Sequence, residues 1–411
     1  MQEKKDLWVQ PEAWASFLRC CARTRELYVP RLGVEAVILR MLLRQNKDKT
    51  FFSSRSLSWQ ETPSVAGMLT SLVHSSLQTL QISIDPDVEM SADKLGSLIA
   101  VLSVHAPEIE NMVIQSPDGT RSFPVDAVLR HVHLRELTLG GDIAISGEDF
   151  WTLLSLPHLH SLQVNLAGTN SLSDDHSPHS AVASYSSMTL RNLAFSAPCD
   201  TADALLSLLN APSLQNLALH VDEARYDQRF RAHSTLLRTI AGALFANSLL
   251  SLEYASANIY SELAPKRHQS LNLDPDDILP DPFLSDQLIS DILAPFFPAS
   301  CSLYLPLLER FSFEMFWPMG VQDGDMQQLS AAFGSTATIL ERNPLPPSLR
   351  AISVAYPAHL TTMRRLAERC PDAEVLTLIV EYDSLNDPES PAMESVGEYG
   401  VEDDDGVGYA I

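Results

Sequence analysis

The chain has 411 residues, 45% of them hydrophobic, and a formal net charge of −24 at pH 7. So acidic a chain is a poor match for nucleic acid, because phosphate binding needs a basic face. No run of about 18 consecutive apolar residues is present, so no membrane-spanning helix is predicted. The start lacks an apolar signal-peptide region and the five cysteines are scattered, which favours a cytoplasmic or nuclear location.

A capping helix is predicted at the start of the chain, over residues 11–23 of an N-terminal segment 1–23. Trp14, Phe17 and Cys21 follow one another there at helical spacing. Terminal repeats of a stack are atypical, because one of their faces has no neighbour to cover it. We therefore assign this segment as the cap that leads into the first strand, at 24–29.

The short pattern Leu-x-x-Leu-x-Leu then recurs along the chain and defines its organisation. In the clearest stretch it starts at Leu134 and again at Leu159, 25 residues later, with a helix-like segment between. Such a period is the signature of a leucine-rich repeat, in which a strand alternates with a return helix. With 24–29 the pattern predicts twelve strands, the others being 54–59, 77–82, 109–114, 134–139, 159–164, 190–195, 214–219, 249–254, 308–313, 349–354 and 373–378.

Amphipathic runs between these strands predict helices on the opposite side of the sheet. They include 65–75, 91–106, 124–132 and 200–211, of which two begin near the capping residues Ser91 and Asp200. Strands that alternate with helices favour a parallel sheet. The predicted fold is an α/β, leucine-rich-repeat-like solenoid over 24–380: a curved horseshoe with parallel strands on its concave face and helices on its convex face.

Three segments depart from the period. Residues 168–188 are rich in Ser, Asp and His, and residues 256–302 are rich in Pro and Asp, so both are predicted to be insertions. The tail 381–411 contains ten acidic residues and no Lys or Arg. Such a segment cannot bury enough apolar surface to fold, so we predict that it is disordered.

Candidate catalytic and metal-binding residues are few. Nucleophile-elbow, phosphate-loop and zinc-helix motifs are absent from the sequence. Two clusters offer metal-ligand chemistry but lie in the insertions, where we expect solvated loops: Asp174, Asp175, His176 and His179, then Asp274, Asp276 and Asp277. No metal, cofactor or catalytic residue is predicted. His133 and His158 share a repeat position, so their rings could form a proton-sensitive contact or serve as ordinary turn residues.

Residues between the pattern leucines are predicted to face a partner protein. They are mostly small or neutral and polar: Gln81, Gln115, Glu136, Thr138, Gln163, Asn165, Asn192, Asn216 and His220. Phe311 and Phe313 occupy pattern positions and are expected in the core. Phe316 and Trp317 follow that strand, where they could pack under the preceding insertion or supply the aromatic anchors that interfaces favour.

The opening segment also resembles a known family. The pattern W-x-x-F-L-R-x-x-x-R-x-R-E-L, from Trp14 to Leu27, is similar to the segment after the F-box in F-box/leucine-rich-repeat proteins of mushroom-forming fungi. The repeats PHLHSLQV and PSLQNLAL are similar too, and the resemblance covers roughly residues 7–380. It implies a substrate receptor of a cullin–RING ubiquitin ligase, in which the F-box binds a Skp-type adaptor and the horseshoe binds the target.

The F-box itself is not found in this sequence, so adaptor binding is expected only if an F-box exists upstream. The favoured function is a non-enzymatic protein–protein interaction module that resembles the target-binding part of such a receptor. Its partner would be an unidentified target protein, with no nucleic acid or membrane, and the chain itself a monomer. A repeat scaffold or GTPase regulator unrelated to ubiquitin is an alternative, and a metal-dependent enzyme built in the insertions is a second.

Overall fold

The computed structural model divides the chain into two compact units, Met1–Thr169 (unit 1) and Asn170–Ile411 (unit 2). The structure describes residues 16, 19–21, 23–29, 39–40, 54–63, 67–88, 90–116, 123–141, 143–166, 185–222, 235–236, 239–240, 242–243, 246, 248–257, 307–315, 349–358, 368 and 372–380. Most of the predicted helix at 11–23, most of both insertions and the tail from 381 lie outside these residues. Their predicted boundaries therefore stay predictions.

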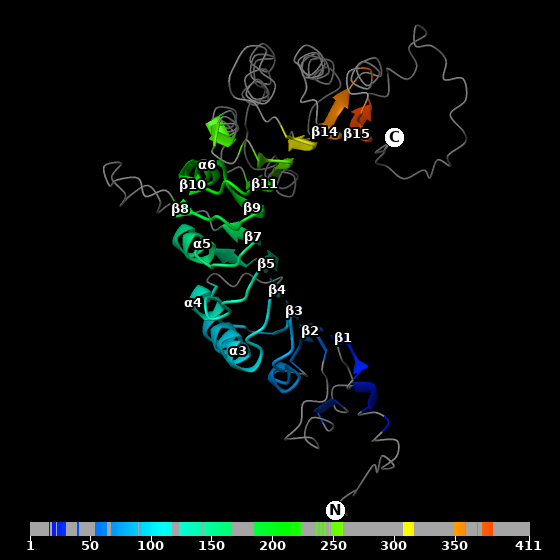
Figure 1. Cartoon of the computed structure of the whole chain (residues 1–411), viewed down its shortest axis with the longest axis vertical. Coiled ribbons are helices and arrows are strands. Elements are labelled where there is room, and N and C mark those ends of the chain that lie inside the picture. The colour runs from blue at the N-terminus through cyan, green and yellow to red at the C-terminus, as the bar shows by residue number, and fades with distance from the viewer. Residues whose placement is uncertain are drawn as a thin grey trace, which may run out of the picture. The chain divides into compact units, whose positions relative to one another are not determined.

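The described part of unit 1 is built on six parallel strands, each paired with the next along the chain (Figure 1). Among the described residues, helices α3, α4 and α5 pack on one side of these strands (Figure 1). A short seventh strand, β6 (Ala144–Ile145), pairs with β7. The six are β1 (Glu26–Val29), β2 (Ser56–Glu61), β3 (Thr79–Ile84), β4 (Asn111–Ser116), β5 (Glu136–Gly141) and β7 (Ser161–Leu166).

Unit 2 repeats this arrangement in its described residues, with six parallel strands again paired in chain order. A separate short pair joins β8 (Tyr185–Ser186) to β10 (Leu209–Asn210). The six are β9 (Asn192–Pro198), β11 (Asn216–Asp222), β12 (Ser251–Ala257), β13 (Arg310–Met315), β14 (Ala351–Ala358) and β15 (Val375–Val380).

All twelve predicted strands are thus confirmed, and each begins two residues after the predicted start. The delay has a backbone cause, seen at Leu134. Its N–H donates to the carbonyl of His131 over 3.0 Å, so the first pattern leucine closes a turn and the sheet starts after it.

The pattern leucines form the core, as predicted. Leu134, Leu137 and Leu139 are at most 1% exposed. Leu137 stands opposite Leu162 in parallel register, so each repeat places its apolar side chains against those of the next. Fully burying one such side chain stabilises the fold by about 1.5–3 kcal/mol. Both units therefore have the leucine-rich-repeat-like α/β solenoid architecture that the sequence predicts.

Two helices of unit 1 match their sequence signals closely. Helix α3 (Ala92–His105) begins after Ser91, whose side chain accepts the N–H of Lys94, and it buries Leu95, Ile99 and Leu102. Helix α5 (Gly147–Leu154) begins with a capping box between Ser146 and Asp149. These caps satisfy backbone N–H groups that have no partner within the helix.

Other predicted helices are shorter or differently placed. The run at 65–75 forms a single 3-10 turn in its described part, Leu69–Ser71 (η1), and the run at 124–132 forms only α4 (Val125–Val128). The steps between strands are short here, so turns use residues that the pattern assigned to helix. Helix α6 spans Cys199–Leu208, which places Asp200 in the first turn and not at the cap. Within the described part of the chain, no helix has the length and apolar character needed to cross a membrane.

Candidate functional site

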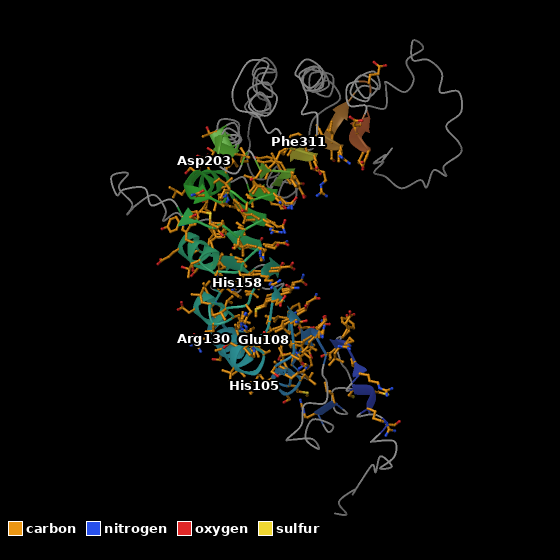
Figure 2. The ribbon with its side chains drawn as sticks, in the orientation of Figure 1. His105, Glu108, Arg130, His158, Asp203 and Phe311 are labelled. Carbon is orange, nitrogen blue, oxygen red and sulfur yellow. The ribbon has the colours of Figure 1, made fainter. Side chains whose placement is uncertain are left out.

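The strands of unit 1 turn alternate residues away from the core, and in-register pairing aligns these residues in rows. The first outward row is Glu26, Ser56, Thr79, Asn111, Glu136 and Ser161. The second outward row is Tyr28, Ser58, Gln81, Val113, Thr138 and Gln163. The third outward row is Gln60, Ser83, Gln115 and Gly140. These rows face away from the helices and form the candidate site (Figure 2).

The chemistry of the first two outward rows is mostly neutral and polar. Glu26 and Glu136 are their two carboxylates, and neither row contains a Lys, Arg or His. Tyr28 is the one aromatic residue of these rows, and its side chain is 71% exposed. Such a face offers hydrogen-bond donors and acceptors to a partner, but no positive charge for phosphates.

The backbone holds these rows at fixed spacing through a repeated hydrogen-bond arrangement. The carbonyl of Glu110 accepts the N–H of both Arg135 (2.7 Å) and Glu136 (3.0 Å). The same two-donor arrangement recurs at each step between consecutive main strands within either unit. A platform fixed in this way loses little conformational freedom when it binds, which favours affinity.

The residues that provide these carbonyls also form a row of side chains at the start of the strands, which we call the entry row. In unit 1 it is Arg25, Arg55, Gln78, Glu110 and Arg135, and His160 has the same position before β7. Nε of Arg135 lies 3.6 Å from Oε2 of Glu110, an ion pair between neighbouring repeats. The sequence analysis missed this row, although its signal is present: the position after the first pattern residue is arginine in several repeats.

Five of the predicted binding residues of unit 1 lie in these rows. Glu136 is in the first outward row, Gln115 is in the third, and the second contains Gln81, Thr138 and Gln163. No contact described here tests whether they bind a partner.

Asn165 has a structural contact within unit 1. Its Nδ2 donates to the carbonyl of Gly141 over 2.6 Å, which ties the end of β5 to β7. Gly141 has a φ of +71°, a conformation that residues other than glycine rarely adopt.

In unit 2 the predicted residues Asn192 and Asn216 contact each other, since Nδ2 of Asn216 donates to Oδ1 of Asn192 over 2.5 Å. His220 is exposed on β11, opposite Ser196. Phe311 is 1% exposed, which confirms its predicted place in the core, and Figure 2 labels it. Phe316 and Trp317 lie outside the described residues, as does the side chain of Phe313.

Two buried histidines were also missed by the sequence analysis. His131 is 0% exposed; its Nε2 lies 3.4 Å from the carbonyl oxygen of Ile99, and its Nδ1 has no hydrogen-bond partner. His74 is buried with Nδ1 2.9 Å from Oγ of Ser76, and its Nε2 has no partner. Burial lowers the pKa of both rings below the ordinary histidine value, and at His131 the Ile99 contact acts weakly in the other direction.

The histidines that the sequence did single out are exposed. His133 and His158 each stand three residues before their strands, so they share a repeat position as predicted. Neither ring is buried, and no contact between the two is described. The buried histidines, His74 and His131, each lie five residues before their strand. This position is two residues earlier in the repeat than that of His133 and His158.

A buried carboxylate closes the end of β2. Glu61 is 4% exposed, and its Oε2 accepts Nε1–H of Trp59 over 2.6 Å. Its Oε1 accepts the N–H of Gly67 over 3.3 Å. Burial raises the pKa of Glu61, and these two hydrogen bonds offset part of that rise. Both oxygens are occupied by donors of the same chain, so the carboxylate holds a turn in place and is not exposed to a substrate.

Metal-ligand geometry is not found in the part of the chain that the structure describes: no three His, Cys, Asp or Glu side chains gather there as an ion would require. The predicted clusters at 174–179 and 274–277 fall outside that part, so the loops that contain them stay untested.

Comparisons with known proteins add little beyond this geometry. No protein-family description matches the sequence, and no curated protein matches it. A solved structure to which the chain is similar is the leucine-rich repeat-containing protein LegL7 from Legionella pneumophila. The two are 10% identical, with 88% of this chain and 95% of that chain covered at a TM-score of 0.37. The repeat architecture therefore rests on the register and periodic core of this chain itself.

Proposed function

We propose that this chain is a non-enzymatic protein–protein interaction module and that the outward rows of unit 1 bind its partner. The observation that carries the proposal is the alignment of small, neutral-polar side chains across six in-register strands. At about 4.8 Å per strand, six strands span roughly 24 Å, which suits the surface of a folded partner.

The chemistry of the rows favours a protein partner over the other classes. The first two rows contain no base, so they have nothing to neutralise a phosphate backbone. The buried carboxylate of Glu61 already accepts two hydrogen bonds from its own chain and is a poor general base. A regular polar platform with an exposed ring at Tyr28 matches the composition of transient protein interfaces.

We further propose that the partner is a target protein presented to a ubiquitin ligase. The support is the resemblance of the segment from Trp14 to Leu27, and of the repeats, to F-box/leucine-rich-repeat receptors. In this proposal the 411 residues supply target binding alone. A purified Skp-type adaptor should then not bind them, and firm adaptor binding would place the ligase contact within this chain.

The decisive experiment adds positive charge to one side of unit 1 at a time. In the test variant, Gln81→Arg and Thr138→Arg place two guanidinium groups in the second outward row. In the control variant, Ser97→Arg and Ser155→Arg place the same charge at exposed positions on α3 and after α5.

Proteins captured from cell extract by the wild type should be retained by the control and lost by the test variant. Retention by both variants would show that the outward rows are not the binding surface. A small GTPase as the captured partner would instead favour the regulator alternative over the ligase receptor.

A further inference from the structure

Positive charge gathers in the part of the sequence that contains the first two strands of unit 1, although the whole chain is strongly acidic. Residues 1–63 contain 11 of the 28 Lys and Arg residues but only seven of the 52 Asp and Glu residues, which gives them a formal charge of +4. The other 348 residues therefore have a formal charge of −28. A basic segment on so acidic a chain favours contact with an anionic partner there and nowhere else.

Arg25 and Arg55 bring two exposed arginines to adjacent positions at these strands. They are neighbours in the entry row, because the N–H of Arg55 donates to the carbonyl of Arg25 over 2.7 Å. Both residues are exposed, as is Arg23, two residues before Arg25. Paired strands lie about 4.8 Å apart, and like charges on adjacent strands destabilise a sheet.

Elsewhere in the entry row such a charge is compensated by an acid. Nε of Arg135 lies 3.6 Å from Oε2 of Glu110, and an arginine of unit 2 is paired with a glutamate in the same way. Among the described residues, no ion pair joins Arg25 or Arg55 to a carboxylate. Glu26, the next residue in sequence, is exposed and is not paired with either of them. The described part of unit 1 thus leaves both guanidinium groups available to an anion from outside.

The positive part of the entry row is short. After Arg25 and Arg55 the row continues with the neutral Gln78 and the acidic Glu110. The outward rows beside it contain no Lys, Arg or His. A nucleic-acid backbone needs several basic contacts in succession, whereas two adjacent guanidinium groups match a small number of carboxylates. The arrangement therefore fits an acidic peptide better than a run of phosphates.

We propose that Arg25, Arg55 and Tyr28, which we call the arginine patch, bind an acidic segment of the partner protein that covers the outward rows. A guanidinium group binds a carboxylate through two parallel hydrogen bonds, a geometry that an Asp or Glu side chain satisfies. Tyr28 lies in the second outward row, and its 71% exposed side chain adds an aromatic contact of the kind that accompanies arginine at interfaces. The patch therefore connects the entry row with the outward rows.

This inference rests on the proposed function, because the acidic segment belongs to the partner of the outward rows. It adds the chemistry and the orientation of that partner. The rest of the chain is acidic and repels such a segment, so the patch fixes which end of the partner lies at the first strands.

The test measures binding of a short, fluorescein-labelled polyglutamate peptide to the full-length protein by fluorescence anisotropy at low salt. A polyglutamine peptide of the same length is the uncharged probe, and a single-stranded oligonucleotide represents the phosphate class. The patch variant combines Arg25→Ser and Arg55→Ser. The control variant combines Arg130→Ser on the helix side of unit 1 (Figure 2) with Arg191→Ser in the entry row of unit 2, and so removes the same charge from exposed positions elsewhere. Circular dichroism and thermal unfolding confirm that each variant is folded.

Wild type and control should bind polyglutamate equally, and the patch variant about tenfold more weakly, as expected for the loss of two exposed ion pairs. High salt should weaken the binding, and polyglutamine should not bind. Equal binding by wild type and patch variant would overturn the proposal, as would the absence of polyglutamate binding by the wild type. Tighter, patch-dependent binding of the oligonucleotide would overturn it as well, because the patch would then be a nucleic-acid site.

A conservative replacement separates hydrogen-bond geometry from charge. Arg25→Lys with Arg55→Lys keeps both charges but removes the paired hydrogen bonds. This variant should bind polyglutamate more tightly than the patch variant and less tightly than the wild type. Wild-type affinity would contradict the paired contact with carboxylates.

The outward rows are tested separately, so the two proposals can fail independently. Gln81→Arg with Thr138→Arg leaves the arginine patch in place, and this variant should still bind polyglutamate while it loses the proteins captured from extract. Loss of captured proteins in that variant, together with no polyglutamate binding by the wild type, would refute the arginine patch alone. Retention of the captured proteins would refute the outward rows as the binding surface, whatever the peptide shows.

Discussion

The two units share one repeat turn but place different side chains in it. Five residues before a strand, unit 1 has the buried histidines His74 and His131 in two repeats and the buried Ala106 and Leu156 in two others. The described residues of unit 2 have Ser187, Ala211 and Ala246 at this position, all buried. The backbone is alike: the carbonyls of His131 and Ala211 each accept the N–H three residues later over 3.0 Å. The fold therefore requires the turn and the space at this position, but not the imidazole ring.

The contrast extends to the other buried polar groups. Among the described residues, unit 1 buries the ionisable side chains of Glu61, His74, Asp85 and His131, together with the thiol of Cys21. In the described part of unit 2, the buried polar groups are the hydroxyls of Ser187 and Thr201 and the phenol of Tyr254. Among the described residues, the buried histidines thus both lie in unit 1.

The largest expected effect comes from burying a charge in the leucine core of one unit at a time. Leu137→Asp in unit 1 and Leu217→Asp in unit 2 should each cost several kcal/mol, since both side chains are 1% exposed and an unpaired buried charge is expensive. Hydrogen exchange by mass spectrometry, measured separately over each unit, should show the greater loss of protection in the unit that carries the change.

Thr138→Asp is the matched control, because it adds the same charge one residue further on, on the outward side. It should leave exchange and urea unfolding close to wild type. Equal loss of protection in both units from either leucine change would show that the chain unfolds as one cooperative block, and the comparison between units would then have no energetic meaning.

A second test uses the glycines with positive φ, which in the described residues are both in unit 1. At Gly141 (φ +71°) an added Cβ would lie 2.0 Å from the carbonyl oxygen of Ser116, whereas at Gly67 (φ +78°) it would meet nothing within 4 Å. A residue other than glycine in this backbone conformation lowers the free energy of unfolding by roughly 1–3 kcal/mol. Gly141→Ala should lower it by more than this because of the added clash, and Gly67→Ala by about this amount or less. Urea midpoints measure both, and equal costs would mean that β4 moves to relieve the clash.

Much of this architecture could be predicted, because leucine spacing and sheet register express the same constraint. Leu134 and Leu159 start repeats 25 residues apart, and the structure pairs the corresponding strands β5 and β7. The short connections were harder: 65–75 has an amphipathic pattern but forms one 3-10 turn in its described part. Periodicity shows which residues are apolar. It does not show how few residues are left to form a helix once the turns of a short connection have been made.

The candidate site was predicted only in part, for a related reason. Alternation along a strand identifies outward residues such as Gln81 and Gln163, since they lie between pattern leucines. It does not predict the structure just before each strand. There the N–H of Arg55 donates to the carbonyl of Arg25 in the preceding repeat, and the side chain of His131 is buried in the core. Those features depend on which turn residues point inward, and a sequence pattern of period two does not contain that information.

The pH response should distinguish the units directly. Because burial lowers the pKa of His131 and His74, the folded state binds fewer protons than the unfolded chain at and just below the ordinary histidine pKa of about 6.5. Their contribution to stability is therefore complete above that pKa and is lost as pH falls through it, by up to about 1.4 kcal/mol per pH unit for each ring. The pKa of Glu61 is raised, so its contribution to stability changes with pH in the opposite direction: it increases as pH falls towards the ordinary carboxyl range.

His131→Leu tests this assignment, since the next repeat has Leu156 at the equivalent place. Urea midpoints at pH 7.5 and 5.5 should differ less in this variant than in the wild type. His133→Leu, at an exposed ring two residues away, should retain the full wild-type difference. The same pH difference in wild type and His131→Leu would mean that other groups govern the acid response.

The smallest expected effect concerns the two ion pairs of the entry row, one in each unit. The Arg135–Glu110 pair of unit 1 has side chains 56% and 36% exposed, whereas the Arg350–Glu374 pair of unit 2 has side chains 61% and 69% exposed. Glu110 is thus the less solvated acid, so its pair is screened less by water and salt.

In double-mutant cycles with Arg→Gln and Glu→Gln changes, the coupling at Arg135–Glu110 should exceed that at Arg350–Glu374. Both should stay below about 1 kcal/mol, as is usual for exposed pairs. Raising the salt concentration should reduce both couplings, and a coupling in unit 2 equal to or larger than that in unit 1 would show that exposure does not rank the pairs of this row.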